Sequence, residues 1–335
     1  MMIELRRQVL TTELLHPERD FRPVRSDVEV RWDPLTGHTA RLVPARGLMP
    51  PSELDLETFA HKTATRCPFC GERLAKLTPK LPPELSAEGR IAIGRAVLFA
   101  NLHAYGQHSS VSVYSPDLHY LPLERMTARL VADNLATQVA FARAVMAVDA
   151  SSRWATIGAN HMLPSGSSLF HPHLQGIVDP LPTTLQRLLA DVPAQRFDAY
   201  LAAERKTGER HLGSTGRVEW LASFAPLAPG ELRAFLPGVA SPTELDDALV
   251  DELAHGLAAA LGLYAELGFQ SFNMALYGAP PGTRGYPLNL RLACRSNLAP
   301  LYRSDSTHLE RLHWEAAIDL WPEEIAARAG ERFRT

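Results

Sequence analysis

The sequence predicts an α+β fold made of two similar units, each with an antiparallel sheet and helices. Of its 335 residues, 46% are hydrophobic and 21% are charged, which is the balance of a globular chain with one large or two ordinary cores. Short apolar or alternating segments of strand length occur together with two long segments of helical periodicity. The order strand, strand, helix, strand, loop, strand occurs in both halves of the chain, which indicates a duplicated unit.

The first unit has a predicted strand pair, a long helix and a second strand pair that flanks a polar loop. The apolar side of its helix is formed by Leu130, Val131, Leu135, Val139, Val145 and Val148. In chain order, these elements are predicted at residues 95–102, 109–115, 123–148, 154–160, 164–168 and 170–178.

The second unit repeats this order after a connecting region. Its helix begins at Ser241-Pro242-Thr243-Glu244, a capping box with proline at the first helical position. The strands, helix and loop are predicted at residues 217–224, 231–236, 242–267, 270–277, 278–285 and 287–294. A helical segment at 183–206 and a polar linker at 204–214 are expected between the units. The pattern divides the chain into an N-terminal half, 1–190, and a C-terminal half, 191–335.

Charge and composition exclude several classes of protein. There are 34 Lys and Arg residues against 37 Asp and Glu, the formal net charge is −3, and no basic block occurs, so no nucleic-acid partner is expected. The first residues lack the features of a signal peptide, and no apolar run approaches the roughly 18 residues of a membrane span. Three cysteines, two of them in one motif, do not make a disulfide framework. We therefore expect a cytoplasmic protein without a membrane partner.

The segment His171-Pro172-His173-Leu174-Gln175 carries the strongest chemical signal. Alternate residues of an extended segment project from one face, so His171, His173 and Gln175 are expected to share a face. A neutral imidazole can attack phosphorus without first losing a proton, and a covalent intermediate then divides one transfer into two easier steps. His173 is the candidate nucleophile and Gln175 the candidate that holds phosphate oxygens. The alternative is two surface histidines in a loop that contains proline.

The segment Cys67-Pro68-Phe69-Cys70 is a Cys-x-x-Cys turn. Two thiolates at this spacing can bind one Zn²⁺, whose tetrahedral shell then needs two further ligands. A redox pair is expected at the start of an amphipathic helix, which does not clearly follow here, and a pair of inert core cysteines is the third alternative. The candidate histidine ligands are His103, His108, His119, His161 and His171.

Several stretches, taken in order, resemble the galactose-1-phosphate uridylyltransferase family of the histidine-triad superfamily of nucleotidyl transferases. The resemblance covers nearly the whole chain. It rests on Asp33-Pro34-Leu35-Thr36-Gly37, Val43-Pro44-Ala45-Arg46, Cys67-Pro68-Phe69-Cys70, Phe99-Ala100-Asn101, Tyr114-Ser115-Pro116-Asp117, Asn160, Gly166-Ser167-Ser168, His171-Pro172-His173-Leu174-Gln175, Tyr277-Gly278-Ala279-Pro280, Pro300-Leu301-Tyr302-Arg303-Ser304 and Trp314-Glu315.

The resemblance implies a role for each matching residue. His173 matches the family's nucleophile and Gln175 the glutamine that hydrogen-bonds the transferred phosphoryl group. The matches to structural zinc ligands are Cys67, Cys70, His171 and, one residue later than the family pattern, His119. The matches to positions that line the nucleotide and its phosphates are Arg46, Asn101, Asn160, Gly166 and Ser168. The implied fold is a pair of histidine-triad-like half-barrel units in one chain, and the implied assembly is a homodimer.

The second half departs from the family pattern. Residues 288–292 stand where the histidine motif stands in the first half, so only the first unit keeps the nucleophile. Tyr277 and Arg291 occupy places where family members often have ligands for a second metal, so a second metal is not expected. Trp321-Pro322 stands where the family places a glutamine near the sugar phosphate. These differences lie on the acceptor side of the implied site.

The function that the resemblance implies is transfer of a nucleoside monophosphate, UMP in the family, from a nucleotide sugar to a sugar 1-phosphate through nucleotidyl-His173. Such a UDP-glucose–hexose-1-phosphate uridylyltransferase-like enzyme belongs to galactose metabolism. Two alternatives stay open. Inorganic phosphate can be the acceptor, which gives a nucleotide-sugar or dinucleotide phosphorylase such as an ADP-glucose phosphorylase. The chain can also be a nucleotide-binding protein without turnover.

Overall fold

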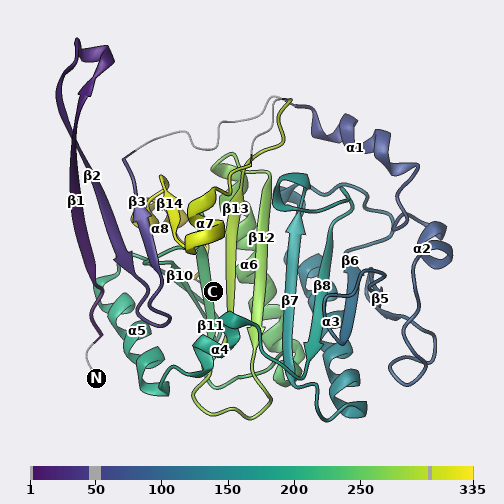
Figure 1. Ribbon diagram of the computed structural model, residues 1–335. Helices are drawn as coiled ribbons and strands as arrows, with labels where there is room; N and C mark the ends of the chain where they lie inside the picture. The colour runs from purple at the N-terminus through teal and green to yellow at the C-terminus, as the bar shows by residue number, and fades with distance from the viewer. Residues whose placement is uncertain (1–2, 45–53, 301–303, 335) are drawn as a thin grey trace.

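The computed structural model describes residues 3–44, 54–300 and 304–334. Its main feature is a ten-stranded sheet in which every neighbouring pair is antiparallel. Two long helices pack on the back of this sheet, and a smaller sheet projects at one side (Figure 1). The predicted α+β fold with a large antiparallel sheet is confirmed.

The two halves of the large sheet have equivalent strand orders when the strands are counted from the middle to each edge. From one edge to the other the strands are β4 (Ile91–Ile93), β5 (Ala96–Ala100), β6 (His108–Val113), β8 (His173–Asp179), β7 (Trp154–His161), β12 (Ser271–Gly278), β13 (Leu288–Arg295), β11 (Leu232–Leu236), β10 (Val218–Ala222) and β9 (His211–Thr215).

Strands β7 and β12 form the central seam, where Gly158 lies opposite Ala275. On either side of the seam the chain makes three strands, a long helix and two further strands, in the same order. One hydrophobic core nevertheless extends across both halves, from Tyr114 to Phe333. The seam and the core join the two halves into one body. The division of the chain at residue 190 stays a prediction.

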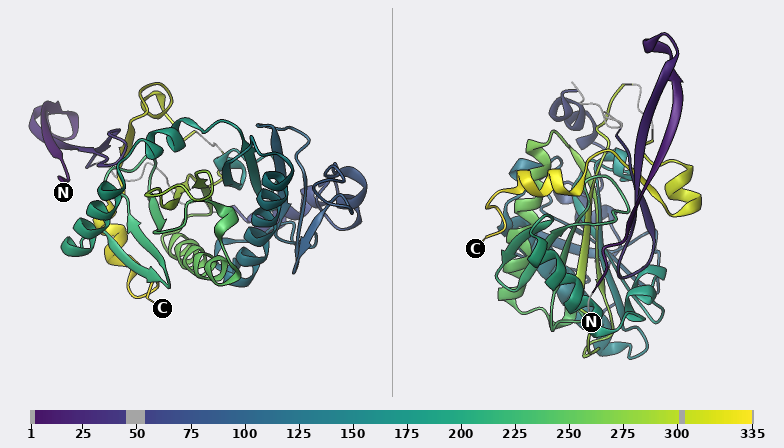
Figure 2. Two further views of the ribbon diagram at one scale, coloured as in Figure 1. Left: turned by 90° about the horizontal axis from the view of Figure 1, so that it is seen from below. Right: turned by 90° about the vertical axis from the view of Figure 1, so that its left-hand side faces the viewer.

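The long helices α3 (Ala128–Val148) and α6 (Asp247–Glu266) lie side by side on the back of the sheet (Figure 2). Both begin later than predicted because an N-cap residue ends a short 3₁₀ turn before each helix. Thr127 caps α3 after the turn Leu123–Arg125, and Asp246 caps α6. The predicted capping box at Ser241 is present, but it caps the 3₁₀ turn Pro242–Glu244.

Helix α6 is long and apolar enough to cross a membrane by length and composition alone. In this fold its apolar residues pack into the shared core, with Leu253 and Ala260 fully buried. Burial of this kind is ordinary for a core helix, so the length of α6 carries no evidence for a membrane.

The region between the halves differs from the prediction. It contains helices α4 (Thr184–Ala190) and α5 (Ala194–Thr207) and then strand β9, rather than a polar linker at 204–214. Glu204 and Arg210 are both buried and form an ion pair at 3.0 Å between Oε2 and Nη2. Glu323 forms a second ion pair with Arg210, with Oε1 and Nη1 2.7 Å apart. The charges that make this segment look like a linker are therefore paired inside the protein.

The smaller sheet contains β1 (Arg7–His16), β2 (Arg22–Trp32), β3 (Thr39–Leu42) and β14 (Ala316–Ile318). Strands β1 and β2 form a long hairpin that extends away from the body of the molecule (Figures 1 and 2). A 3₁₀ turn, Pro17–Arg19, lies at its tip. Exposed apolar side chains occur along it at Val9, Leu10, Leu14, Leu15 and Phe21.

The remaining helices are short. They are α1 (Leu56–Ala64), α2 (Glu72–Leu77), α7 (His308–His313) and α8 (Pro322–Ala329), with a further 3₁₀ turn at Leu163–Ser165 between β7 and β8. The turn between α1 and α2 holds the Cys-x-x-Cys motif.

Candidate active site and metal centre

Two cysteines and two histidines from separate parts of the chain meet near the start of β8. The side chains of Cys67, Cys70, His119 and His171 place one ligand atom each within 4.8 Å of all the others. Nδ1 of His119 lies 3.2 Å from Sγ of Cys70, and Nδ1 of His171 lies 3.4 Å from the same sulfur and 3.7 Å from Sγ of Cys67. Ligands of a tetrahedral zinc ion with Zn–S near 2.3 Å and Zn–N near 2.0 Å lie about 3.5 Å apart. The cluster therefore could hold a metal.

The other nitrogen of each histidine ring is fixed by a protein oxygen. Nε2 of His171 lies 2.9 Å from the carbonyl oxygen of Ser115, and Nε2 of His119 lies 2.9 Å from Oγ1 of Thr63. A proton on Nε2 leaves the lone pair of Nδ1 pointing at the cysteines, which is the tautomer that a metal ligand needs. Burial lowers the pKa of His171 to about 3, which keeps its ring neutral.

The cysteines themselves are not joined by a disulfide. Burial raises the pKa of the Cys67 thiol to about 12, so neither a reactive thiolate nor a redox role is favoured there. A bound metal ion would reverse this preference, because it stabilises the thiolate. The buried sulfur of Cys67 and the half-buried sulfur of Cys70, beside two correctly oriented imidazoles, make a donor set that could hold a metal ion.

The remaining candidate histidines do not reach the cysteines. His103 is exposed, and His108 lies 2.9 Å from a carboxylate oxygen of Asp149. His161 is buried and stacks on Phe272 with ring centroids 5.0 Å apart.

His173 and Gln175 lie on β8 and face a cavity in front of the sheet. Strand β8 begins at His173 rather than at residue 170, so His171 precedes the strand and anchors its first residue. Nδ1 of His173 lies 2.8 Å from the carbonyl oxygen of His171. A carbonyl only accepts, so Nδ1 carries the proton and Nε2 keeps its lone pair. Burial lowers the pKa of His173, which also favours the neutral ring.

The cavity beside His173 has a volume of about 290 Å³. Its walls come from the Cys-x-x-Cys turn, from β5 and from the loop after it. Phe69 is central, because its ring centroid lies 5.5 Å from that of His173 and 5.2 Å from that of Phe99. Leu102 and Tyr105 line the same cavity although they are 70% and 71% exposed. Exposed apolar groups over a cavity are suited to covering a flat ring.

Sequence reasoning did not assign Phe69, Leu102 or Tyr105 to the site. The signal for Phe69 was its position inside the cysteine motif, where a residue between the two cysteines of one turn is held close to both. The signal for Leu102 and Tyr105 was weaker, since exposed apolar residues in a loop are common.

The residues predicted to line the nucleotide do not all lie at the cavity beside His173. Asn101 and Ser168 line the cavity, and Oδ1 of Asn101 also accepts a hydrogen bond from the backbone N–H of His103 at 3.0 Å. Asn160 lies on β7, level with His173 when the β7–β8 register is continued. Arg46 lies outside the described residues.

Gly166 is in the left-handed region with φ of 97°, a conformation that glycine adopts without strain. Its N–H donates to the carbonyl oxygen of Leu163 at 3.0 Å. Gly166 therefore ends the 3₁₀ turn Leu163–Ser165, and its place beside the nucleotide stays a prediction.

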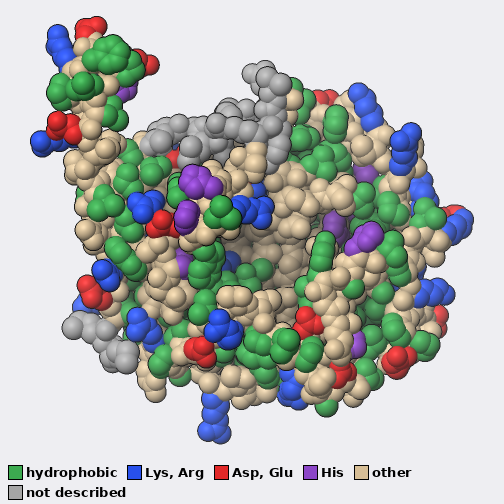
Figure 3. Space-filling view, viewed as in Figure 1, with side chains coloured by type: hydrophobic (Ala, Val, Ile, Leu, Met, Phe, Trp, Pro, Cys, Tyr) green, Lys and Arg blue, Asp and Glu red, His purple; other side chains and the backbone are tan. Residues whose placement is uncertain are grey.

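The sheet face that carries His173 is hollowed near its centre (Figure 3).

Within the second half, Arg291 takes the place of Gln175. Gln175 lies opposite Gly158 of β7, and Arg291 lies opposite Ala275 of β12, the residue that pairs with Gly158 at the seam. By the same register Asn289 takes the place of His173. An amide and a guanidinium are poor nucleophiles at neutral pH, so these two positions of the second half offer no counterpart to the imidazole of His173.

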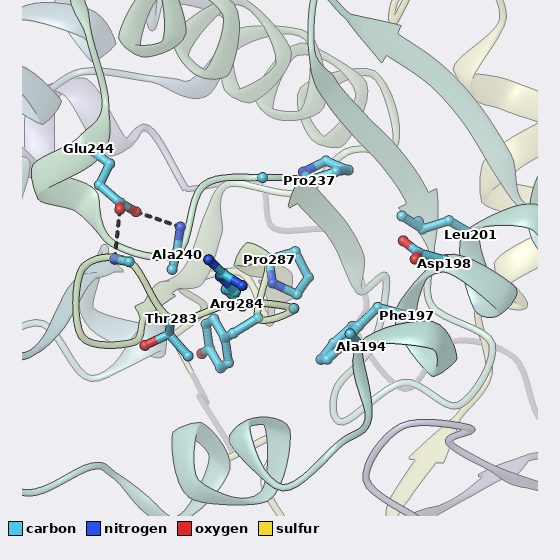
Figure 4. A pocket seen from close by; sticks show the side chains of 14 residues that line it. Ala194, Phe197, Asp198, Leu201, Pro237, Ala240, Glu244, Thr283, Arg284 and Pro287 are labelled. Atoms are coloured by element: carbon cyan, nitrogen blue, oxygen red, sulfur yellow. Dashed lines mark hydrogen bonds between the residues drawn. The ribbon is translucent and has the colours of Figure 1, made fainter.

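A different cavity of about 310 Å³ lies at the other end of the sheet, between α5 and the loop 279–287 (Figure 4). Arg284 points into it. The carboxylate of Glu244 is not available there, because it accepts hydrogen bonds from the backbone N–H groups of Ala240 and Gly282 at 2.7 and 2.8 Å. This cavity contains none of the predicted site residues.

The antiparallel α+β fold, the Cys–His cluster that could hold a metal and the histidine that faces the cavity together indicate the class of protein. The fold is that of the galactose-1-phosphate uridylyltransferase-like proteins, as the resemblance in motifs implies. An ADP-glucose phosphorylase and a GalT-like protein, both from Arabidopsis thaliana, each match with a TM-score of 0.65 at 18% and 17% identity. The matches cover 91% of this chain and 98% and 99% of theirs.

A uridylyltransferase structure matches with a TM-score of 0.57 and 20% identity over 91% of this chain and 98% of that chain. By sequence, an uncharacterized protein from Archaeoglobus fulgidus is 29% identical over 317 residues, which are 91% of this chain and 92% of that protein. No protein-family model matches the sequence.

Proposed function

We propose that this protein is a nucleotidyltransferase that moves a nucleoside monophosphate from a nucleotide sugar to a phosphate acceptor through His173. The observation that carries the proposal is the 2.8 Å contact between Nδ1 of His173 and the carbonyl oxygen of His171. It gives a ring with its reactive Nε2 unprotonated and held in one orientation, which covalent transfer requires.

In the first step, Nε2 of His173 attacks the α-phosphorus of the nucleotide sugar. A nitrogen–phosphorus bond forms, the bond from the α-phosphorus to the bridging oxygen breaks, and the sugar 1-phosphate leaves with that electron pair. In the second step, an oxygen of the acceptor phosphate attacks the same phosphorus, and the nitrogen–phosphorus electron pair returns to Nε2. The side-chain amide of Gln175 is placed two residues along the strand to donate a hydrogen bond to a non-bridging oxygen.

We assign the four-residue cluster to Zn²⁺ held by Cys67, Cys70, His119 and His171. A zinc ion held there would supply rigidity rather than chemistry at phosphorus. It would tie the turn between α1 and α2 to His171, which precedes β8 and whose carbonyl oxygen orients His173.

Two acceptors are compatible with this chemistry. With a sugar 1-phosphate as acceptor and UMP as the transferred group, the enzyme is a UDP-glucose–hexose-1-phosphate uridylyltransferase. With inorganic phosphate, it is a phosphorylase of the ADP-glucose type. The second reading draws support from the fold, which agrees better with ADP-glucose phosphorylase than with uridylyltransferase, at TM-scores of 0.65 and 0.57.

The test is the intact mass of the protein after incubation with UDP-glucose and, separately, with ADP-glucose. The added mass identifies UMP or AMP. His173→Ala should show no adduct, whereas His255→Ala, which changes an exposed histidine on α6, should be labelled like the native protein. Absence of any adduct on the native protein would favour a nucleotide-binding protein without turnover.

A further inference from the structure

Two asparagines face each other across the seam, one strand away from the candidate nucleophile. Asn160 of β7 lies opposite Asn273 of β12, and the β7–β8 register, when it is continued, places Asn160 level with His173. Directly opposite residues of antiparallel strands share a face, and neighbouring strands are about 4.8 Å apart. The side chain of Asn160 therefore lies on the face of the sheet that carries His173.

The side-chain amide of Asn273 is held in one orientation from two sides. Its Nδ2 donates to the carbonyl oxygen of Ser165 at 2.9 Å, and its Oδ1 accepts from Nη1 of Arg295 at 2.5 Å. A carbonyl oxygen only accepts and a guanidinium only donates. The oxygen and the nitrogen of this amide therefore cannot exchange places without the loss of both hydrogen bonds.

Arg295 is itself anchored by Asp305. The carboxylate of Asp305 accepts from Nε of Arg295 at 2.9 Å and also contacts Nη2 of the same guanidinium. One of its oxygens accepts from the backbone N–H of Ser296 at 2.7 Å as well. The side chains of Arg295 and Asp305 are only 17% and 6% exposed. This two-point contact occupies one edge of the guanidinium and leaves Nη1 for Asn273.

The orientation of Asn273 determines that of Asn160. Nδ2 of Asn273 donates to Oδ1 of Asn160 at 2.6 Å, so the oxygen of the Asn160 amide faces the seam. The NH₂ group of Asn160 consequently points away from Asn273. No residue in the described part of the chain accepts a hydrogen bond from this NH₂ group, and Asn160 is only partly buried. An oriented donor without an acceptor is suited to an anionic oxygen of a bound molecule.

We propose that Asn273 and Arg295 are positioning residues, which hold the NH₂ group of Asn160 ready to donate to a phosphate oxygen of the nucleotide beside His173. The inference rests on the proposed function. Neither positioning residue has to touch the nucleotide, because the hydrogen bonds run in one direction from Arg295 through Asn273 to Asn160. Each amide accepts on one side and donates on the other, and a row of hydrogen bonds in one direction is mutually strengthened.

The experiment reverses the direction of this row. In Asn273→Asp the new carboxylate only accepts, so it can pair with Arg295 but draws the NH₂ group of Asn160 toward itself. The amide oxygen of Asn160 then faces the nucleotide. We expect the rate at which nucleotide sugar labels His173 to fall about 10²–10³-fold, as it should in Asn160→Ala, because one oriented donor is lost in both.

Three further variants test the orientation itself. Asn273→Leu branches at the same atom but forms no hydrogen bond, so it frees the Asn160 amide without reversing it and should lower the rate less. Arg295→Lys still only donates and should keep most of the native rate. Gln195→Glu, which makes the same change from amide to acid at an exposed residue of α5, is the matched control and should be labelled like the native protein.

A double-mutant cycle separates positioning from a general structural role. In protein that carries Asn160→Ala, the addition of Asn273→Asp or Asn273→Leu should change the labelling rate less than about twofold, because the group that Asn273 orients is absent. A further loss as large as the one in the native background would overturn the inference. If Asn273→Asp does not fold, as judged by thermal unfolding, the cycle with Asn273→Leu provides the same test.

Titration calorimetry with UMP and AMP keeps this inference distinct from the proposed function, because binding needs no turnover. The Kd of the nucleotide that binds should rise about ten- to hundredfold in Asn273→Asp, and no further when Asn160→Ala is already present. If the native protein is labelled but the cycle is additive, the proposed function stands and the inference is wrong. If the native protein is never labelled but Asn273→Asp weakens binding only where Asn160 is present, the proposed function fails and the positioning stands. No binding of either nucleotide to the native protein would overturn the inference.

Discussion

Asp33 and Arg233 form an ion pair in which neither side chain has any exposed surface, with Oδ2 and Nη1 2.9 Å apart. Arg291 lies 3.7 Å from the same carboxylate oxygen, and its Nη1 also contacts Glu231 at 2.5 Å. The segment that follows β2 is thereby attached to strands β11 and β13 of the second half. Burial alone would raise the pKa of Asp33, but the positive charges of Arg233, His38 and Arg291 hold it well below its ordinary value.

The first prediction concerns this pair. Asp33→Asn should lower the free energy of unfolding by about 3–5 kcal/mol, because it leaves buried guanidinium groups without their counter-charge. A group with a depressed pKa in the folded state stabilises the protein above its unfolded pKa, near 3.9, and loses that contribution as the pH falls further. The difference between native protein and variant should therefore shrink below about pH 4.

Urea unfolding at a series of pH values measures this difference. Asp198→Asn, a change at an exposed aspartate on α5, serves as the control and should match the native protein throughout. A constant difference between pH 7 and pH 3 would contradict the assignment to the Asp33 charge.

The second prediction is one Zn²⁺ per chain. Elemental analysis of protein purified without chelator should find stoichiometric zinc, and Cys67→Ser or His119→Ala should reduce it. A ligand present at 100 times its Kd stabilises by about 2.7 kcal/mol, so chelation should lower Tm by about 4 °C in a chain of this size. His108→Ala, at a histidine that pairs with Asp149 instead, should keep its zinc. Full zinc content in His119→Ala would mean that another residue is the fourth ligand.

The third prediction separates the roles of the two residues on β8. His173→Ala should abolish labelling by α-labelled nucleotide sugar, whereas Gln175→Ala should still label about 10²–10³ times more slowly, since it loses one oriented donor. In His173→Gly, added imidazole should restore part of the transfer. The adduct on the native protein should be labile in acid and stable in alkali. Undiminished labelling of His173→Ala would exclude His173 as the nucleophile.

The fourth prediction concerns the hairpin of β1 and β2. A two-stranded hairpin alone is marginal in water, and here Leu15 and Phe21 are 60% and 65% exposed. We therefore expect a homodimer in which the partner covers the hairpin. Leu15→Glu with Phe21→Glu should raise the dissociation constant at least about tenfold, as measured by light scattering across a dilution series. Val148→Glu, at a residue 52% exposed at the end of α3, should have no such effect.

Eight of the ten strands of the large sheet and both long helices could be predicted because the side chains of each element follow one period, whereas the short strand β4 and the strand β9 were not predicted. Strand β7 alternates between intermediate and buried residues along its whole length, and α6 buries one continuous side. The hairpin offers no such pattern. Nine of the ten residues of β1 are exposed, so both of its faces meet solvent and alternation carries no signal.

Part of the candidate site could also be predicted from the sequence. Cys67, Cys70, His171 and His173 lie in two short motifs, and the chemistry of those residue types restricts what each can do. The support of Asn160 by Asn273 was not accessible, because that contact joins residues 113 positions apart and depends on the register of the seam. Arg210 is a further case, since its burial depends on Glu323 near the other end of the chain.

The pairing of β7 with β12 at the seam makes each half of the sheet depend on the other. If β12 were removed, β7 would become an edge strand with unpaired backbone groups, and Asn160 would lose the amide that orients it. Strand β12 of the second half therefore fixes the position of Asn160, which is level with His173. An insertion in β12 that shifts the register by one residue would turn the Asn273 side chain to the opposite face.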